Sequence, residues 1–160
     1  MSKALAGFVI FGAVIGLMMP GGRSSSAGAP EATSTTYSAV PVETRVRRSQ
    51  GGHFYVHALV NGQLVRFVVD TGATTVALTP EDAERIGLKV DPSDFEVIGE
   101  GAAGPIRGQM VQLDSVNLDG KQVNHIRAAV LDGAEISLLG QNYLSQIRSV
   151  QMAGDEMILR

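Results

Sequence analysis

The sequence predicts an all-β fold with one or two short helices. Two observations support this prediction. Short segments in which apolar and polar residues alternate recur along the chain after residue 50, and this alternation is typical of strands with one buried face. The pairs Asn61-Gly62 and Asp119-Gly120 join consecutive segments of this kind, which indicates tight β-hairpins.

The composition limits the size and the chemistry of the protein. A chain of 160 residues with 44% hydrophobic residues is long enough for one ordinary domain. Its net charge of -3 and its aromatic content of 5% give no reason to expect nucleic acid as a partner. Without cysteine it has no disulfide, thiolate metal site or cysteine nucleophile. We expect no cofactor and no metal ion.

The first 20 residues predict a signal peptide or an N-terminal membrane anchor. An apolar run from Ala4 to Met19 follows Lys3 and ends at Pro20-Gly21-Gly22, and a cleavage site is possible after Ala27. A buried core helix fits the charged start and the flexible end less well. Export would place the rest of the chain in the periplasm or at the extracytoplasmic face of the membrane, with the membrane as a partner if the segment is retained.

Residues 21–50 are expected to form a flexible linker before a folded domain of residues 51–160. Gly, Ser, Ala, Thr and Pro dominate the first part, a composition that buries too little surface to fold. Arg45, Arg47 and Arg48 then form a charge run that we interpret as solvated. A contact with anionic lipid or an acidic partner is the alternative.

The domain is expected to begin with a hairpin that ends at an acid. Segment 53–60 reads as a strand, Asn61-Gly62 as its turn and segment 63–69 as the partner strand, which leads directly into Asp70. His53 and His57 do not indicate a metal site. On a strand they lie about 13 Å apart, and no third ligand accompanies them.

The acid opens a turn, Asp70-Thr71-Gly72, between two apolar runs. An Asp at such a turn either caps its own loop or is a reactive carboxylate held on rigid β-structure. The second run, 76–78, is followed by a helix start in which Thr79 is the N-cap and Pro80 the first residue. Gly87 ends this helix.

The stretch from Gly99 to Gly104 matches the spacing of a dinucleotide-binding loop, but such a loop must open a helix. Because segment 106–116 alternates like a strand, we expect a glycine-rich hairpin tip between strands 95–98 and 106–116. A helix after Gly104 would favour nucleotide binding instead.

The second half faintly repeats the first. A hairpin at Asp119-Gly120 leads through segment 123–131 to Asp132, then to an apolar strand over 136–140 and a short helix over 141–147. Asp132 lacks a following hydroxyl residue, so a turn is the preferred interpretation over a second catalytic acid. Tyr143 is expected to be structural. A last hairpin pairs residues 150–152 with 157–159.

These motifs occur in an order that resembles the single-domain aspartic proteases of the retropepsin type, in their bacterial, membrane-anchored or periplasmic form. The resemblance runs from about His53 to Leu159 and depends on Asp70-Thr71-Gly72, the hairpin before it, the helix after it and Leu138-Leu139-Gly140 downstream. It implies a closed β-barrel, the acid-protease half-fold. The glycine tip then corresponds to a flap, although the aromatic residue that pepsins place there is missing.

The resemblance also implies roles for individual residues. The implied catalytic residues are Asp70, Thr71 and Gly72. The implied substrate-binding residues are Ala73, Gly101, Ala102, Ala103 and Gly104. The implied structural motif, Leu138, Leu139 and Gly140, packs against the turn, and the Thr71 hydroxyl keeps two turns in register across a dimer axis.

A single Asp-Thr-Gly turn supplies only half of the chemistry that such an enzyme needs. Hydrolysing an amide without metal or a covalent nucleophile requires an acid and a base side by side, and two carboxyls that share one proton supply both. The prediction is therefore an aspartic endopeptidase that acts on protein or peptide as a homodimer, with Asp70 of both chains at the axis. A catalytically silent, peptide-binding dimer is the alternative.

Overall fold

The computed structural model describes residues 41–101 and 104–160. Its strands are β1 (Thr44–Arg47), β2 (Tyr55–Val60), β3 (Gln63–Val69), β4 (Val76–Leu78), β5 (Glu96–Gly101), β6 (Gly104–Leu118), β7 (Lys121–Leu131), β8 (Ser137–Leu139), β9 (Val150–Ala153) and β10 (Glu156–Leu159). Its helices are α1 (Pro80–Arg85), α2 (Gln141–Leu144) and the single 3-10 turn η1 (Pro92–Asp94). The all-β prediction with two short helices is confirmed.

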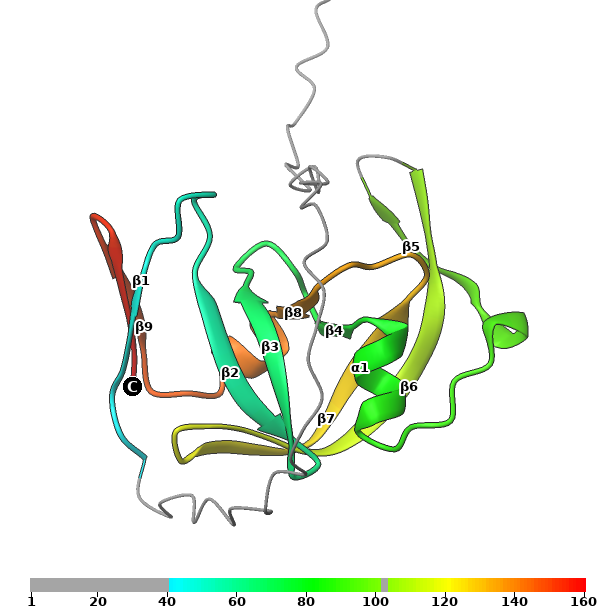
Figure 1. Ribbon diagram of the computed structural model, residues 1–160, viewed down its shortest axis with the longest axis horizontal. Coiled ribbons are helices and arrows are strands. Elements are labelled where there is room, and N and C mark those ends of the chain that lie inside the picture. Colours follow the sequence, from blue (N-terminus) through cyan, green and yellow to red (C-terminus); the bar gives the residue numbers. More distant parts are fainter. Residues whose placement is uncertain (1–40, 102–103) are drawn as a thin grey trace, which may run out of the picture.

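Six strands close into a barrel. Their order is β2-β3-β8-β4-β7-β6, and the ring closes because β2 also pairs with β6 through Leu59↔Asn117 and Val60↔Val116. Strand β5 pairs only with β6 and extends the sheet outside the ring (Figure 1). The closed barrel expected from the sequence is therefore confirmed.

Local turn chemistry fixes the two predicted hairpins. Asn61 and Gly62 have φ angles of 50° and 83°, and Asp119 and Gly120 have the same pair of values. Positive φ at both central residues matches the right-handed twist of the flanking strands, and Asn, Asp and Gly are the residues that tolerate it. Both hairpins form where the sequence predicts them.

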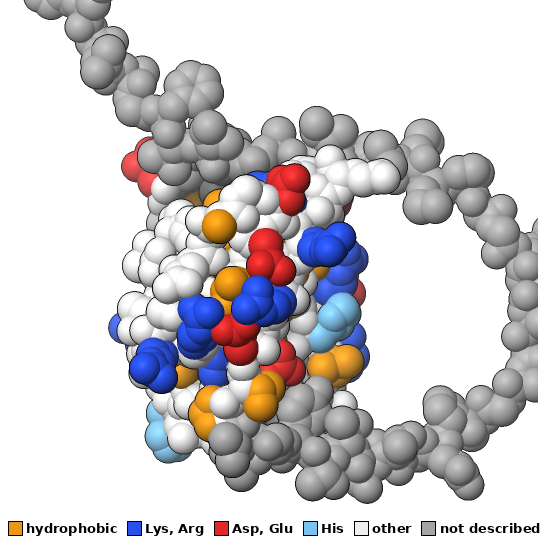
Figure 2. All heavy atoms as spheres, turned by 90° about the vertical axis from the view of Figure 1, so that its left-hand side faces the viewer, with side chains coloured by type: hydrophobic (Ala, Val, Ile, Leu, Met, Phe, Trp, Pro, Cys, Tyr) orange, Lys and Arg blue, Asp and Glu red, His pale blue; other side chains and the backbone are white. Residues whose placement is uncertain are grey.

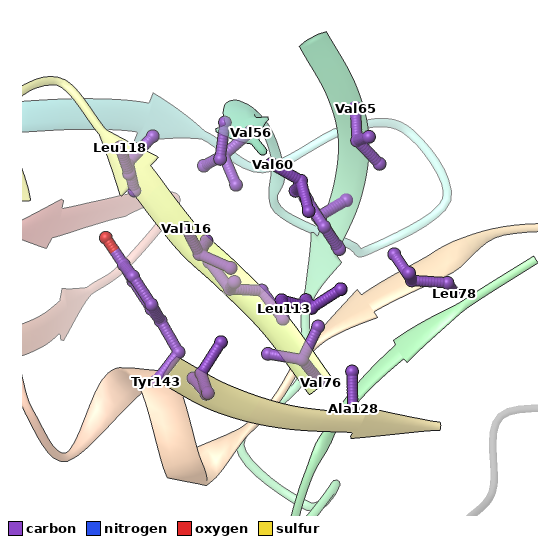
Figure 3. Close-up of a cluster of buried hydrophobic side chains, with 14 of the residues drawn as sticks. Val56, Val60, Val65, Val76, Leu78, Leu113, Val116, Leu118, Ala128 and Tyr143 are labelled. Atoms are coloured by element: carbon purple, nitrogen blue, oxygen red, sulfur yellow. The ribbon is translucent and has the colours of Figure 1, made fainter. Parts of the chain in front are cut away.

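The core fills the barrel with aliphatic side chains from nearly every strand. The close-up in Figure 3 shows them pointing toward one another, with Tyr143 of α2 reaching in from one side. The labelled side chains that are at most 3% exposed are Val56, Val60, Val65, Val76, Leu78, Leu113, Val116, Leu118, Ala128 and Tyr143. Each residue alternates with an outward neighbour along most of β2, β6 and β7, which is why these strands read as period-two patterns.

The faint repeat is a real feature of the topology. Strand β3 leads through a loop to β4 and α1, and β7 leads through a second loop to β8 and α2. The two halves exchange partners, because β3 pairs in parallel with β8 and β4 pairs in parallel with β7. Each short strand of one half therefore lies beside a longer strand of the other half.

The predicted linker requires a correction at its end. Thr44–Arg47 forms strand β1, which pairs with β10 in a separate three-stranded sheet. The arginines are not simply solvated: Arg45 bonds Glu156 at 3.0 Å, and Arg48 bonds Asp155 at 3.3 Å. Figure 2 shows basic and acidic side chains interleaved on this face. The physical reason is that β9 pairs with only one edge of β10. The backbone N–H and C=O groups on its other edge need hydrogen-bond partners, and β1 provides them.

The remaining predictions for the N-terminal region lie outside the described residues, since the apolar run and most of the linker fall within 1–40. In the part of the chain that the structure describes, no helix is long and apolar enough to cross a membrane. The predicted helix after Thr79 is confirmed, and its cap is present because Asp82 N donates to Thr79 Oγ1 at 3.0 Å.

Candidate active site

Strand β3 delivers Asp70 to the end of a central, buried strand. Val68 and Val69 are 9% and 8% exposed and pair with Leu138 and Leu139 of β8. The register continues one step further, because Asp70 N donates to Leu139 O at 3.1 Å. The carboxylate is thus carried by a strand that has neighbours on both sides, which fixes its position.

The turn after Asp70 folds back onto the carboxylate. Asp70 Oδ1 accepts hydrogen bonds from Gly72 N at 2.8 Å and from Ala73 N at 3.2 Å. The two interpretations of this turn are therefore compatible, since the acid caps its own loop with one oxygen. Within residues 41–101 and 104–160, Oδ2 makes no hydrogen bond, and the side chain is partly exposed.

The predicted structural motif lies directly against this turn. Leu139 is fully buried in β8, and Gly140 crosses the loop that follows Asp70. A Cβ atom built on Gly140 would lie 2.4 Å from Thr75 O and 2.8 Å from Ala73 O. Only glycine allows the two backbones to approach so closely, which explains why a glycine follows the two leucines.

Two residues that the sequence interpretation treated only as a helix start also hold the turn. The backbone N–H groups of Gln141 and Asn142 donate to Ala73 O at 2.8 Å and to Thr74 O at 3.0 Å. The Asn142 side chain accepts from Val76 N at 2.9 Å and donates to Arg127 O at 2.7 Å. Their position directly after the crossing glycine was the only signal available in the sequence.

The hairpin of β5 and β6 lies where the sequence predicts a glycine-rich tip between two strands. Its strands are longer than expected, and Gly101 pairs with Gly104 at the end that the structure describes. Ala102 and Ala103, two of the predicted substrate-binding residues, lie outside the described residues. In the view of Figure 1, the described ends of β5 and β6 and the loop after β3 lie on the upper side of the barrel.

The nucleotide-binding alternative is wrong. A dinucleotide loop needs a helix after its last glycine, but Gly104 begins the 15-residue strand β6. In the part of the chain that the structure describes, no three His, Cys, Asp or Glu side chains are grouped so that they could hold a metal ion.

Asp132 does not join Asp70. Strand β4 runs antiparallel to β8 with Ala77 opposite Leu138, so the two loops leave opposite ends of this pair. The length of the three-residue strand β4, about 10 Å, therefore separates them. Asp132 is exposed, and its N–H donates to Arg107 O at 3.0 Å, which agrees with the preferred interpretation as a turn.

Tyr143 has a structural role, as predicted. Its side chain is fully buried, and its hydroxyl donates to Lys121 O at 2.6 Å. Burial raises the pKa of Tyr143 well above its ordinary value of 10.0. A buried phenol with a raised pKa stays protonated at neutral pH, where its hydroxyl holds Lys121 O.

Comparison with known proteins identifies relatives of this arrangement. The profile of the family described as aspartyl protease matches residues 56–143. A crystal structure of a retropepsin-like aspartic protease from Rickettsia conorii shares 34% identity and a TM-score of 0.62, covering 74% of this chain and 89% of that chain.

Two curated relatives are both named as uncharacterized. One, from Rickettsia prowazekii, is 35% identical over 73% of this chain and 51% of its own length. The other, a Sinorhizobium protein named for the region 5′ of cobV, is 36% identical over 81% of this chain and 56% of its own length. The chain thus spans about half the length of the curated relatives it matches.

Proposed function

This chain belongs to the aspartyl protease family and has the retropepsin-like fold, and from that premise we propose that it is an endopeptidase that works as a homodimer. The observation that carries the proposal is the fixed Asp70 carboxylate at the end of β3. Gly72 N and Ala73 N bind one of its oxygens and leave the other for chemistry. A turn of this kind, held by Gly140 and α2, is a rigid platform for a reactive acid.

In the proposed mechanism each chain contributes one Asp70. Two carboxyl groups that meet at the dimer axis hold one proton between them, because like charges so close do not both ionise. The ionised carboxylate takes a proton from a bound water, which attacks the substrate carbonyl. The protonated carboxyl donates to the carbonyl oxygen, so no covalent intermediate forms.

The need for a second chain follows from the single catalytic turn. Asp132 leaves the opposite end of the β4–β8 pair, and this arrangement favours a second acid from a partner chain over one from the same chain. In the proposed dimer, the Thr71 hydroxyl bonds across the axis and keeps the two turns in register.

The proposed substrate is an extended segment of protein or peptide. Ala73 lines the site beside the acid, and the glycine-rich flap from Gly101 to Gly104 closes over the bound strand. Hydrogen bonds from such a flap to the main chain of the substrate do not depend on the substrate's side chains. They therefore allow peptides of many different sequences to bind, as in other cases of strand addition.

The experiment that tests the proposal compares the full-length protein with Asp70→Asn on a mixed peptide library. We expect cleavage by the wild type and none by the variant, with the same circular dichroism spectrum. An Asp70→Asn protein that retains most of the cleavage would refute the proposal. A wild type that binds peptides without cutting them would support the silent, peptide-binding alternative.

We further propose that the folded domain is exported, because Lys3 and the apolar run after it have the pattern of an export signal. A phosphatase reporter fused after Arg160 should then be active only outside the cytoplasm. A fusion that is fully soluble and inactive inside the cell would contradict export.

A further inference from the structure

The side chain of Gln141, the first residue of α2, reaches into the catalytic turn. Its Nε2 donates to Thr71 O at 2.9 Å, while its backbone N–H donates to Ala73 O at 2.8 Å. Gln141 is exposed, so burial did not force its amide to find a partner. Its contact with the turn therefore needs an explanation in terms of the turn itself.

The carbonyl that accepts from Gln141 and the N–H that makes the shorter hydrogen bond to Asp70 Oδ1 belong to the same peptide unit. Thr71 C=O and Gly72 N–H are the two ends of one planar group. Gly72 N donates to Asp70 Oδ1 at 2.8 Å. A donor at the carbonyl end polarises the unit and strengthens the bond at its N–H end, and it also fixes the orientation of the plane.

Gln141 itself has a rigid base. Asn142, the next residue, bonds Val76 N of β4 and Arg127 O of β7, and Gly140 before it is packed against the turn. The backbone of Gln141 is thus fixed on both sides. An amide that starts from a fixed point can set the position of the peptide that it binds.

We propose that Gln141 is a positioning residue for Asp70, acting through the Thr71–Gly72 peptide. Gln141 holds this peptide so that Gly72 N–H keeps Oδ1 in place and Oδ2 faces the partner carboxyl. The inference rests on the proposed proteolytic function, since it assigns a residue that supports the same acid.

The variant that tests this role is Gln141→Met in the full-length protein, which keeps the length of the side chain and removes the donor. Because a small displacement of a reacting group slows chemistry without changing substrate contacts, kcat should fall about tenfold to a hundredfold. KM should stay within about twofold of the wild type. Gln141→Lys, which restores an N–H donor of similar reach, should recover most of the lost kcat.

The chain offers a matched control in Gln146. This residue is also exposed, and its Nε2 donates to Asn142 O at 2.6 Å, a carbonyl that does not lead to Asp70. Gln146→Met should therefore leave kcat and KM unchanged. Equal losses in the two methionine variants would overturn the proposal, because they would indicate a general effect on α2.

A second measurement does not depend on activity. Amide hydrogen exchange of Gly72 and Ala73 reports the two bonds to Asp70 Oδ1, and Gln141→Met should speed the exchange of Gly72 about tenfold. Wild-type exchange and wild-type kcat in Gln141→Met would each overturn the positioning role. If the wild type shows no cleavage that depends on Asp70, the proposed function fails, while faster Gly72 exchange in Gln141→Met still supports positioning and unchanged exchange refutes it.

Discussion

Replacing Gly140 with alanine tests whether the crossing beneath the catalytic turn is as tight as the structure indicates. Gly140 has φ -91° and ψ -177°, an extended conformation that any residue adopts. Backbone strain therefore plays no part. The added methyl group would meet Thr75 O at 2.4 Å and Ala73 O at 2.8 Å, and both atoms belong to the backbone of the turn.

The expected cost follows from three contributions. Forcing a methyl group into this contact costs about 1–3 kcal/mol. Moving the turn away from Gly140 also weakens the bonds from Gln141 N to Ala73 O and from Asn142 N to Thr74 O, at about 0.5–1.5 kcal/mol each. The lower entropy of the unfolded alanine chain returns about 0.4–1 kcal/mol. The net loss in the free energy of unfolding is therefore about 1–6 kcal/mol.

Urea denaturation followed by far-UV circular dichroism measures this loss. The control is Gly51→Ala, because a Cβ at Gly51 meets its nearest atoms at 3.8 and 3.9 Å, an ordinary contact. The control should be as stable as the wild type or up to about 1 kcal/mol more stable, because the lower entropy of its unfolded chain is not offset by a clash. A Gly140→Ala protein as stable as the control would refute the close crossing and the way in which it holds the turn.

Two further predictions concern Tyr143 and Thr71. Tyr143→Phe removes the bond to Lys121 O and should cost about 1–2 kcal/mol of unfolding free energy at pH 7. Because burial raises the pKa of Tyr143, the unfolded chain loses its phenol proton first, so wild-type stability should fall above about pH 10 and the difference from Tyr143→Phe should shrink; a constant difference between pH 7 and pH 11 would contradict this. Thr71→Val should weaken the proposed dimer by about 1–3 kcal/mol in sedimentation equilibrium, since it removes the hydroxyl that bonds across the axis; an unchanged dissociation constant would count against that bond.

Short-range chemistry explains which parts of the fold were predictable. Asn61-Gly62 and Asp119-Gly120 fix their hairpins by φ, and Thr79 fixes the start of α1 by its side-chain bond. Strand β1 was missed because it is a four-residue edge strand with two arginines whose partner lies at the far end of the chain. Nothing within a local window distinguishes such a strand from a polar linker.

The candidate site divides in the same way. Asp70 stands out in the sequence because it follows an apolar run and opens an Asp-Thr-Gly turn. Gly140 stands out because it directly follows the apolar pair Leu138-Leu139. Gln141 does not stand out, since its contact with Thr71 exists only after β8 has paired with β3. Likewise, the sequence predicts that Asp132 lies at the end of a strand. It does not predict whether Asp132 lies at the same end of the β4–β8 pair as Asp70, because this depends on the antiparallel pairing of the two strands.

Subunit mixing tests the central claim, that two chains supply one Asp70 each to a shared site. Wild-type protein is mixed with nine equivalents of Asp70→Asn, and turnover is measured alongside sedimentation. Random pairing leaves about a tenth of the wild-type chains in wild-type dimers, so activity per wild-type chain should fall to about a tenth. Unchanged activity per wild-type chain, in a protein that sediments as a monomer at the assay concentration, would contradict the account.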